Sequence, residues 1–370
     1  MRLQRIKLAN FRNIRRLDWS PGAGLNVIVG ANAAGKTNLC EALYYPAHGL
    51  LLKGERQREL ICWDEQQAWL ELELGSDLLR IELDARRQRR LLSLNGERGR
   101  QSEVCQVWQA LLFSPDELQI LKGSPGGRRR FFDQAIADLD PEYRRLGYEY
   151  DQFLRRKNAL LKKPHFNREL LEVLNAGLVK RGARLLQGRL AYLRALGDEL
   201  SRQYRQLVPG SAKLELRYRS GLHLGAGPAE APELRARLEE AIRELQAQEI
   251  ERGMALVGPH RDDFSFRLEG AEMRRFSSQG EQKTALIALV LAQLELVQQR
   301  WGEYPVLILD DVLSELDSRR AEALLDNLPS GLQIFLTATE LNERLRAQAG
   351  RFDRMSAGRL SPLLQEEVRI

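Results

Sequence analysis

The chain contains 370 residues, of which 43% are hydrophobic and 29% are charged, so it has the composition of a globular protein long enough for two domains. Its net charge of +6 favours an acidic partner such as nucleic acid, although an arginine-rich solvated surface explains the same value equally well. The three cysteines lack the spacing of a disulfide framework or a zinc site, and the chain shows neither a signal-peptide core nor an apolar stretch long enough to cross a bilayer, so we expect a cytoplasmic protein without a membrane partner.

The N-terminal part of the chain has the patterning of β-strands. Residues 2–11 alternate apolar and polar side chains, and "GLNVIVG" at 24–30 is a short β-branched run that ends at a glycine. The segment "TNLCEALYYPAHG" that follows predicts a helix closed by Pro46 and Gly49. Residues 67–95 contain three hairpin strands, the last of which ends in an Asn-Gly turn.

From about residue 126 the pattern becomes helical. Leu, Ala and Arg recur at helical spacing as far as residue 206, a Gly/Pro loop follows at 221–232, and a charged amphipathic helix follows that loop. Residues 140–206 contain 15 Lys and Arg against 8 Asp and Glu, so the positive charge is concentrated in this region.

Near residue 305 an α/β pattern returns, with the strand "YPVLILDD", a helix near 318–327 and the strand "LQIFLTAT". The sequence therefore predicts an α/β lobe formed by residues 1–125 and 301–370. A helical lobe, residues 126–300, is inserted into it.

Residues 30–37, "GANAAGKT", match the phosphate-loop pattern G-x-x-x-x-G-K-[ST] and lie between a strand and a helix, as that pattern requires. Its glycines let backbone amides turn toward an anion, and the start of the helix adds its positive end. Lys36 is expected to reach the β and γ phosphates of ATP, and the Thr37 hydroxyl to bind Mg²⁺. The predicted nucleotide-binding residues here are Gly30, Ala31, Asn32, Ala33, Ala34, Gly35, Lys36, Thr37 and Asn38.

The strand "VLILDD" supplies the second nucleotide motif. Its residues 306–309 are all apolar, as a buried parallel strand should be. Asp310, at the end of that strand, is placed to hold Mg²⁺ through water, and Asp311 to orient or deprotonate the attacking water. The alternative is an acidic pair that caps the next helix.

Residues 276–284, "FSSQGEQKT", form a polar segment at the start of a strongly apolar helix. A backbone that turns here before a helix beginning at Glu281 offers amide groups and a positive helix end, and Ser278 adds a hydroxyl donor. Because the phosphate loop already serves one nucleotide, we expect this turn to contact the γ-phosphate held by a second copy of the chain. The alternative is an ordinary serine N-cap. The predicted trans residues are Ser277, Ser278, Gln279, Gly280 and Glu281, and the predicted catalytic set is Lys36, Ser278, Asp310 and Asp311.

These three motifs, in this order, resemble the ABC-type ATPase heads of the SMC superfamily, with "SSQGE" in the place of their L-S-G-G-E signature. The stretches "LANFRNIRRL", "FSPDELQILKGSPGGRRRFFD" and "GPHRDDF" make the chain similar to the RecF family of bacterial recombinational-repair and replication proteins over essentially its whole length. The resemblance implies a P-loop NTPase fold. In that fold a β-rich ATPase lobe contains an inserted helical lobe that carries the signature.

The resemblance also implies a function. ATP with Mg²⁺ promotes a homodimer that holds double-stranded DNA, and the family works with RecR and RecO to load RecA at single-strand gaps, which supports the SOS response and fork restart. Residue by residue, it places Arg12 and Asn13 at the edge of the nucleotide, Asp317 in a D-loop that crosses the dimer interface, and Thr339 at the switch position.

Two departures from the family pattern concern the site. Ala33 stands where the family often has glycine, and a positive φ there would cost roughly 1 kcal/mol. Asp311 stands where most ABC-type ATPases have a glutamate that is one methylene longer. We therefore expect a slow, DNA-stimulated ATPase that acts as a switch.

Several basic residues are candidates for DNA contacts: Arg128, Arg129, Arg130, Arg155, Arg156 and Lys157. The first three could contact a nucleotide instead of DNA, and the alternative to either contact is pairing with carboxylates of the ATPase lobe, since arginine serves both uses. His260, in "GPHRDDF", is expected to be a hydrogen-bonded loop residue, or else part of the interface of the signature lobe.

Three rival functions are weighed against this one. A nucleotide-binding subunit of a transporter conflicts with the missing switch histidine, and a structural DNA clamp without ATPase activity conflicts with the intact nucleotide motifs. A nucleotide kinase does not need the second phosphate-seeking helix start.

Overall fold

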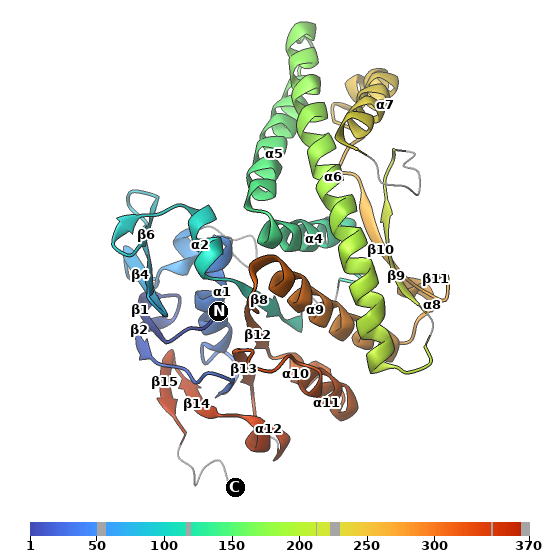
Figure 1. Cartoon of the computed structure of the whole chain (residues 1–370). Helices are drawn as coiled ribbons and strands as arrows, with labels where there is room; N and C mark the ends of the chain where they lie inside the picture. The colour runs from blue at the N-terminus through green and yellow to red at the C-terminus, as the bar shows by residue number, and fades with distance from the viewer. Residues whose placement is uncertain (50–56, 116–119, 212, 223–229, 342, 364–370) are drawn as a thin grey trace. The chain divides into compact units, whose positions relative to one another are not determined.

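The chain divides into two compact units, Met1–Leu118 with Val297–Ile370 (unit 1) and Gln119–Leu296 (unit 2) (Figure 1). The functional lobes predicted from the sequence, with boundaries near residues 125 and 300, stay a prediction. Most of the predicted Gly/Pro loop, at 223–229, lies outside the described residues. The computed structural model describes residues 1–49, 57–115, 120–211, 213–222, 230–341 and 343–363.

The first sheet of unit 1 is antiparallel and is built from the segments predicted as hairpins. Alternate side chains of β4 are buried, so one face of the sheet covers the core. Asn95 and Gly96 both have positive φ, as a two-residue Asn-Gly hairpin turn requires. Its strands in spatial order are β2 (Ile14–Trp19), β1 (Arg5–Phe11), β4 (Gln67–Leu74), β5 (Asp77–Asp84), β6 (Arg89–Leu94) and β7 (Glu97–Arg98).

The second sheet of unit 1 is parallel apart from one edge strand. Its central strands are almost wholly apolar, because both faces of the sheet are covered. The spatial order is β15 (Arg359–Pro362), β14 (Arg351–Ser356), β3 (Leu25–Val29), β13 (Ile334–Ala338), β12 (Val306–Asp310) and β8 (Ala110–Phe113), with β15 antiparallel to β14.

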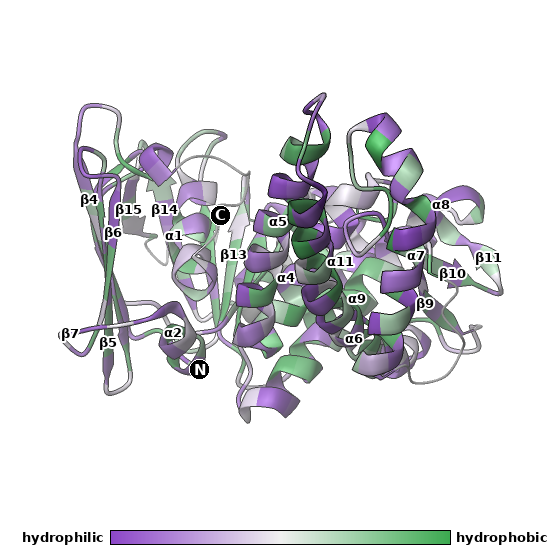
Figure 2. Ribbon diagram, turned by 90° about the horizontal axis from the view of Figure 1, so that it is seen from above, coloured by the Kyte–Doolittle hydropathy of each residue, from purple (hydrophilic) through white to green (hydrophobic). Residues whose placement is uncertain are grey.

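Helix α1 (Lys36–His48) packs between the two sheets, as Figure 2 shows, and its apolar side chains join one core with both. The sequence predicted that Pro46 and Gly49 close this helix, which is confirmed for Gly49 and wrong for Pro46, since Pro46 lies inside the helix. The helix continues to His48 and ends at Gly49, which takes the left-handed φ of 64°. The Gln101 side chain stabilises this end, because its Nε2 donates to the carbonyls of Pro46 and Ala47 at 2.8 and 2.9 Å. The shorter helices of unit 1 are η1 (Gln57–Leu60), α2 (Gln101–Val107), α10 (Val312–Glu315), α11 (Ser318–Asp326) and α12 (Glu343–Gln348).

Unit 2 is mainly helical. Helices α5 and α6 run side by side (Figure 1). The N-termini of α4, α5 and α6 are capped by hydrogen bonds to the side chains of Ser124, Asp140 and Asn167, residue types that favour this position. Its elements are α4 (Pro125–Leu139), α5 (Pro141–Leu161), α6 (Arg168–Leu207), β9 (Leu214–Arg219), α7 (Ala231–Arg252), β10 (Asp263–Leu268), β11 (Ala271–Glu272), α8 (Met273–Phe276) and most of α9 (Gln279–Trp301).

A buried arginine joins the parts of unit 2. The Arg189 guanidinium, on α6, makes two hydrogen bonds of 2.7 and 2.8 Å with Asp133 of α4. It also donates to the Tyr218 hydroxyl on β9 and to the Pro259 carbonyl. Burial alone would disfavour the charge, but Asp133 compensates it, so the pKa of Arg189 stays above its usual range. Within the described part of the chain, every helix is too short or too polar to span a bilayer.

Candidate functional site

Three parallel strands bring the two nucleotide motifs to one edge of their sheet. The strand order β3–β13–β12 places β13 between the strand that precedes the phosphate loop and the strand that ends at Asp310. The carboxyl ends of parallel strands share an edge, so Gly30, Asp310 and Asp311 all lie there. A hydrogen bond of 3.2 Å from Gly30 N to Ala338 O ties the loop to the central strand.

The backbone of the phosphate loop takes a positive φ at two positions. Gly35, which precedes α1, has a φ of 112°, and a Cβ there would lie 2.7 Å from Asn13 Oδ1, so the position needs glycine. Ala33 has a φ of 62°, which confirms that this position takes a positive φ. An alanine in this conformation costs roughly 1 kcal/mol.

The hairpin of β14 and β15 packs against the phosphate loop from the C-terminal part of the chain. Its turn residue Gly358 donates from N to Ala34 O at 2.8 Å. A Cβ on Gly358 would lie 2.2 Å from Asn13 O, and one on Gly30 would lie 2.3 Å from Met355 O. The hairpin therefore approaches the loop more closely than any side chain would allow.

Lys36, the first residue of α1, is nearly buried, with 7% of its surface exposed. Its Nζ donates to the carbonyls of Gly30 at 2.6 Å and Ala31 at 3.1 Å. In this conformation the loop's own carbonyls hold the ammonium group beside the place where a phosphate would enter. The contact of Lys36 with the β and γ phosphates of ATP stays a prediction.

The turn that carries Arg12 and Asn13 is attached to the start of α1. Arg12 makes a bidentate ion pair with the buried Glu41, at 2.6 and 2.9 Å, and Asn13 Oδ1 accepts from Asn38 Nδ2 at 2.8 Å. A guanidinium that makes two parallel hydrogen bonds to one carboxylate fixes the orientation of both side chains as well as stabilising the contact. The structure thus assigns Arg12 a contact inside unit 1, and its predicted contact with the nucleotide stays a prediction.

The two aspartates are linked by one threonine on the central strand. Thr337 Oγ1 donates to Asp310 Oδ1 at 2.7 Å and accepts from Asp311 N at 2.9 Å. Asp311 has a φ of 53°, and its carbonyl accepts from Ser314 Oγ at 2.7 Å. The alternative that the pair caps a helix through its side chains is not seen: Asp311 precedes α10 without a side-chain capping hydrogen bond.

A buried thiol lies beside the same carboxylate. Burial raises the pKa of Cys40 strongly, and the negative charge of Asp310 together with a hydrogen bond to it raises that pKa further. Cys40 therefore stays a neutral thiol and donates toward Asp310. It comes from α1, one turn beyond Lys36.

Sequence reasoning missed Thr337, Glu41 and Cys40 as parts of this site. Thr337 had a visible signal, since it is a polar residue within the apolar strand "LQIFLTA" and follows the acidic motif by one strand. Glu41 and Cys40 had none, because nothing in the sequence tells which side of α1 faces Arg12 or Asp310.

The serine turn of unit 2 begins α9 at Gln279. Ser278 N and Oγ donate to Glu281 Oε2 at 2.7 and 2.8 Å, and Glu281 N lies 3.2 Å from Ser278 Oγ. This is a capping box, so within the single chain the serines act as the ordinary N-cap of the alternative reading. Ser278 and Glu281 are exposed, and the contact of Ser278 and its neighbours with another subunit's nucleotide stays a prediction.

Asp317 and Thr339 are both exposed. Asp317 caps α11 by accepting from Arg320 N at 3.1 Å and pairs with the Arg320 guanidinium, which lowers the pKa of its carboxyl. Thr339 does not end a strand, because β13 ends at Ala338. The hydroxyl that reaches the aspartates belongs to Thr337, two residues earlier, and the switch role of Thr339 stays a prediction.

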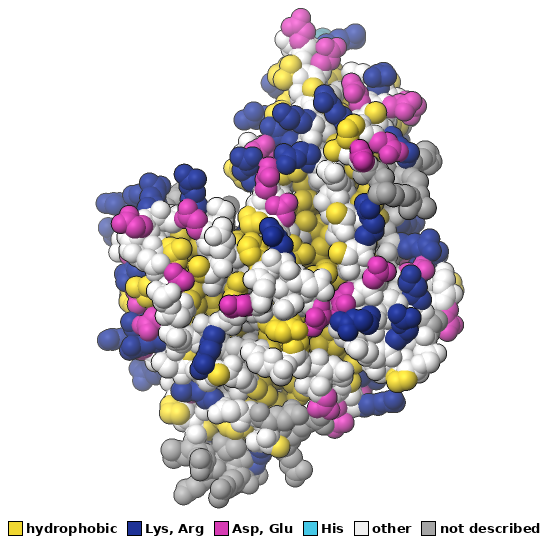
Figure 3. All heavy atoms as spheres, in the orientation of Figure 1, with side chains coloured by type: hydrophobic (Ala, Val, Ile, Leu, Met, Phe, Trp, Pro, Cys, Tyr) yellow, Lys and Arg dark blue, Asp and Glu magenta, His cyan; other side chains and the backbone are white. Residues whose placement is uncertain are grey.

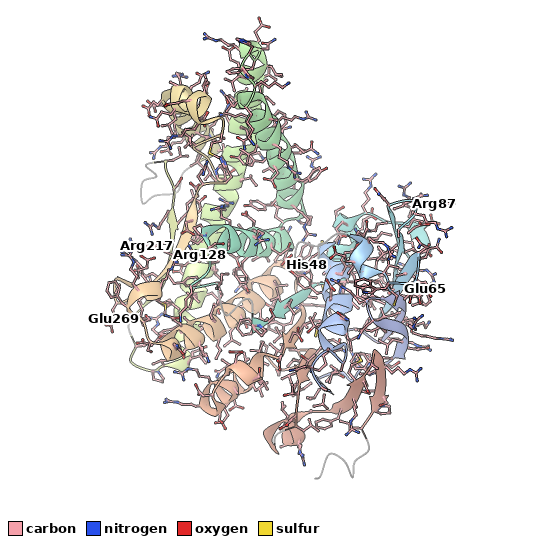
Figure 4. All side chains as sticks on the ribbon, turned by 180° about the vertical axis from the view of Figure 1, so that it is seen from behind. His48, Glu65, Arg87, Arg128, Arg217 and Glu269 are labelled. Atoms are coloured by element: carbon pink, nitrogen blue, oxygen red, sulfur yellow. The ribbon has the colours of Figure 1, made fainter. Side chains whose placement is uncertain are left out.

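Two of the basic residues predicted to contact DNA are buried in ion pairs. Arg128, 4% exposed, makes a bidentate pair with Asp263 of β10 at 2.7 and 2.8 Å and lies inside unit 2 (Figure 4). Lys157 Nζ lies 2.6 Å from Glu249 Oε2, with both side chains 1% exposed. The DNA role is therefore corrected for both. The alternative for Arg128, a carboxylate of the ATPase lobe, is also wrong, since Asp263 belongs to unit 2.

The other basic candidates differ in exposure. Arg129 is partly buried and donates to the backbone carbonyl of Asp262 at 2.7 Å. Arg130, Arg155 and Arg156 are exposed. Figure 3 shows Lys and Arg side chains gathered along the arm that α5 and α6 form. These exposed residues remain candidates for contacts with a phosphate backbone.

His260 is a hydrogen-bonded loop residue, as the simpler expectation had it. Its Nδ1 is 2.8 Å from the Tyr150 hydroxyl, and its Nε2 is 3.5 Å from Ala255 O. Burial lowers the pKa of His260 to about 4, so the ring is neutral at physiological pH.

Comparison with known proteins adds independent evidence. The RecF/RecN/SMC N terminal domain family matches residues 2–357. The DNA replication and repair protein RecF of Symbiobacterium thermophilum is 38% identical over 351 residues, which cover 93% of this chain and 92% of that protein. The RecF of Desulforamulus reducens is 36% identical over 344 residues, 92% of each chain.

Solved structures give the same result. A structure of the recombination mediator protein RecF-ATPrS in the RecFOR pathway superposes with a TM-score of 0.90 at 28% identity and covers 98% of both chains. An Smc head bound to the C-winged helix domain of ScpA has a TM-score of 0.56 at 16% identity, which is evidence of the fold alone. The fold is therefore that of an ABC-type ATPase head, as the sequence motifs predicted.

Proposed function

Since the chain belongs to the RecF family of DNA replication and repair proteins, we propose that it binds ATP at the phosphate loop and uses it to form a head-to-tail dimer on double-stranded DNA. The observation that carries the proposal is that the phosphate loop, which follows β3 and leads into Lys36 at the start of α1, meets Asp310 and Asp311 at one sheet edge. The transporter alternative is not retained, because the relatives that match over most of both chains act in replication and repair.

The side chains at this edge fit Mg²⁺ together with ATP. The Thr37 hydroxyl and the Asp310 carboxylate are hard oxygen ligands, which Mg²⁺ takes in small number beside phosphate oxygens. When bound, Mg²⁺ would neutralise charge that develops on the phosphates. A similar solved protein is RecF-ATP, which supports ATP as the nucleotide. In this chain, Lys36 would leave the carbonyls of Gly30 and Ala31 to meet the phosphates.

The dimer follows from the second half-site. Ser278 and Gly280 lie at the start of α9, where the helix end is positive, and Ser278 is exposed. In the proposed dimer they meet the γ-phosphate bound by the partner copy. Such contacts exist only in the closed dimer, so ATP shifts the population toward it. Hydrolysis, with Asp311 orienting the attacking water, removes the contact and reopens the dimer.

The DNA contact is assigned to the exposed cations of unit 2. Arg130, Arg155 and Arg156 would neutralise phosphates of the duplex without reading its sequence. Binding should therefore weaken steeply as salt rises. As in its family, the protein would act with RecR and RecO at single-strand gaps, promote RecA loading and support the SOS response. Its ATPase would be slow and stimulated by DNA.

Light scattering after size-exclusion chromatography tests the switch. We expect wild-type protein to shift from monomer to dimer mass with ATP, and Lys36→Ala and Ser278→Arg to stay monomeric. Ser76→Arg is the matched control, because Ser76 lies exposed in the turn between β4 and β5 and takes no part in the proposal. A Lys36→Ala protein that still dimerised and bound duplex DNA with ATP would contradict the proposed function.

A further inference from the structure

Thr337 occupies a position that an apolar residue would normally take. It lies in β13, whose other residues are Ile, Phe, Leu and Ala, and it is 1% exposed. The parallel register of β12 and β13 sets it directly beside Asp310. A hydroxyl buried to this degree costs free energy unless it is hydrogen-bonded, so its partners account for its presence.

The hydrogen bonds of Thr337 have only one possible direction. A threonine hydroxyl has a single hydrogen, and the backbone N–H of Asp311 can only donate. The hydroxyl oxygen therefore accepts from Asp311 N, at 2.9 Å, and its own hydrogen goes to Asp310 Oδ1, at 2.7 Å. The Thr337 side chain thus sets both the orientation of the Asp310 carboxylate and the position of the Asp311 backbone.

The backbone of Asp311 needs such support. Its φ of 53° and ψ of 24° are left-handed, a conformation that residues other than glycine rarely adopt. This turn redirects the chain between the end of β12 and α10, so it sets the direction in which the Asp311 side chain leaves the backbone. Thr337 holds its amide, and Ser314 Oγ holds its carbonyl at 2.7 Å.

We propose that Thr337 is a positioning residue for ATP hydrolysis, which orients the Asp310 carboxylate and holds Asp311 in its left-handed conformation. The inference rests on the proposed function and deepens it. Thr337 is too deep in the sheet to touch the nucleotide, so it acts through the two aspartates.

The test compares Thr337→Val, which has the same shape without the hydroxyl, with Thr337→Ser, which retains it. A hydrogen bond to a charged group is stronger than one between neutral groups, and its loss here should slow hydrolysis by about 10- to 150-fold. We expect phosphate release by Thr337→Val to fall by that factor, with the Kd for a fluorescent ATP analogue within about threefold of wild type. Thr337→Ser should stay within about threefold in both.

Two further measurements separate positioning from loss of fold. Tyr45→Phe removes another buried hydroxyl of unit 1 and should leave hydrolysis unchanged. Hydrogen–deuterium exchange should show faster exchange around Asp311 in Thr337→Val but not in Thr337→Ser. If Thr337→Val does not fold, Thr337→Ala replaces it with the same expectations.

The outcomes distinguish this inference from the proposed function. If wild type hydrolyses ATP and Thr337→Val is equally active, the positioning role of Thr337 is overturned and the proposed function is not. A Thr337→Ser variant as slow as Thr337→Val has the same consequence. A wild-type protein that binds but never hydrolyses ATP, with or without DNA, overturns hydrolysis in the proposed function, and the positioning role fails with it.

Discussion

The buried ion pair of Lys157 and Glu249 gives the sharpest test of which basic residues stabilise the fold and which are free for the proposed DNA contact. The two side chains join α5 to α7 at 2.6 Å, and both are 1% exposed. Burial lowers the pKa of Lys157, although Glu249 opposes that shift. Glu249 also accepts a hydrogen bond from Leu256 N at 2.8 Å. The substitution Lys157→Met removes the cation and leaves the carboxylate buried without it.

An unpaired buried charge is costly, and removing one partner of such a pair destabilises a protein by about 3–5 kcal/mol. We expect Lys157→Met to lose that much. Adding Glu249→Gln removes the stranded charge while keeping an oxygen that can accept from Leu256 N. The double variant should therefore recover most of the loss.

Urea denaturation followed by circular dichroism measures these stabilities, with the double-variant cycle reporting the coupling between the two side chains. Duplex DNA binding is then measured over a salt series on folded protein. Arg155→Ala with Arg156→Ala should weaken binding and flatten its salt dependence, whereas Lys157→Met should not. A Lys157→Met protein as stable as wild type but weaker on DNA would refute the assignment of Lys157 to the fold.

Three further expectations follow. Burial lowers the pKa of His260 to about 4 from 6.5, so between these pH values the unfolded chain binds a proton that the folded chain does not. The contribution of His260 to the free energy of unfolding should therefore fall by about 2 kcal/mol from pH 8 to pH 5. The urea midpoint of His260→Gln should lack this part of the pH dependence. Gly358→Ala should lose roughly 1–3 kcal/mol more of the free energy of unfolding than Gly270→Ala. Both glycines have a left-handed φ, but only a Cβ at Gly358 would collide with backbone, 2.2 Å away. Equal decreases in Tm for the two variants would disprove the collision. Asp317→Ala should lower the urea midpoint and Asp317→Asn should lower it by less, because asparagine still caps α11, and equal losses in denaturation would argue against the cap.

Much of the fold and of the ATPase half-site was predictable because its signals are local. The phosphate loop needs a strand, a glycine-rich turn and a helix in direct succession, and residues 25–48 have this order in both sequence and structure. The apolar run before Asp310 likewise predicts β12, since only a strand covered on both faces tolerates it. The family followed from the same ordered motifs.

The fates of individual polar side chains were decided by tertiary structure. The sequence pattern predicts surface cations at Lys157 and Arg128, but the partner of Lys157 is Glu249 and the partner of Arg128, Asp263, is 135 residues away along the chain. Ser278 reads as a phosphate contact, yet in the single chain its hydroxyl meets Glu281. The hydrogen bond from Thr337 to Asp310 exists only because the register of β13 against β12 sets the two residues side by side. Local pattern determines which element forms, because propensity and burial act over a few residues. Which charge or hydroxyl is satisfied inside depends on what packs against it, and that is set only when distant segments meet.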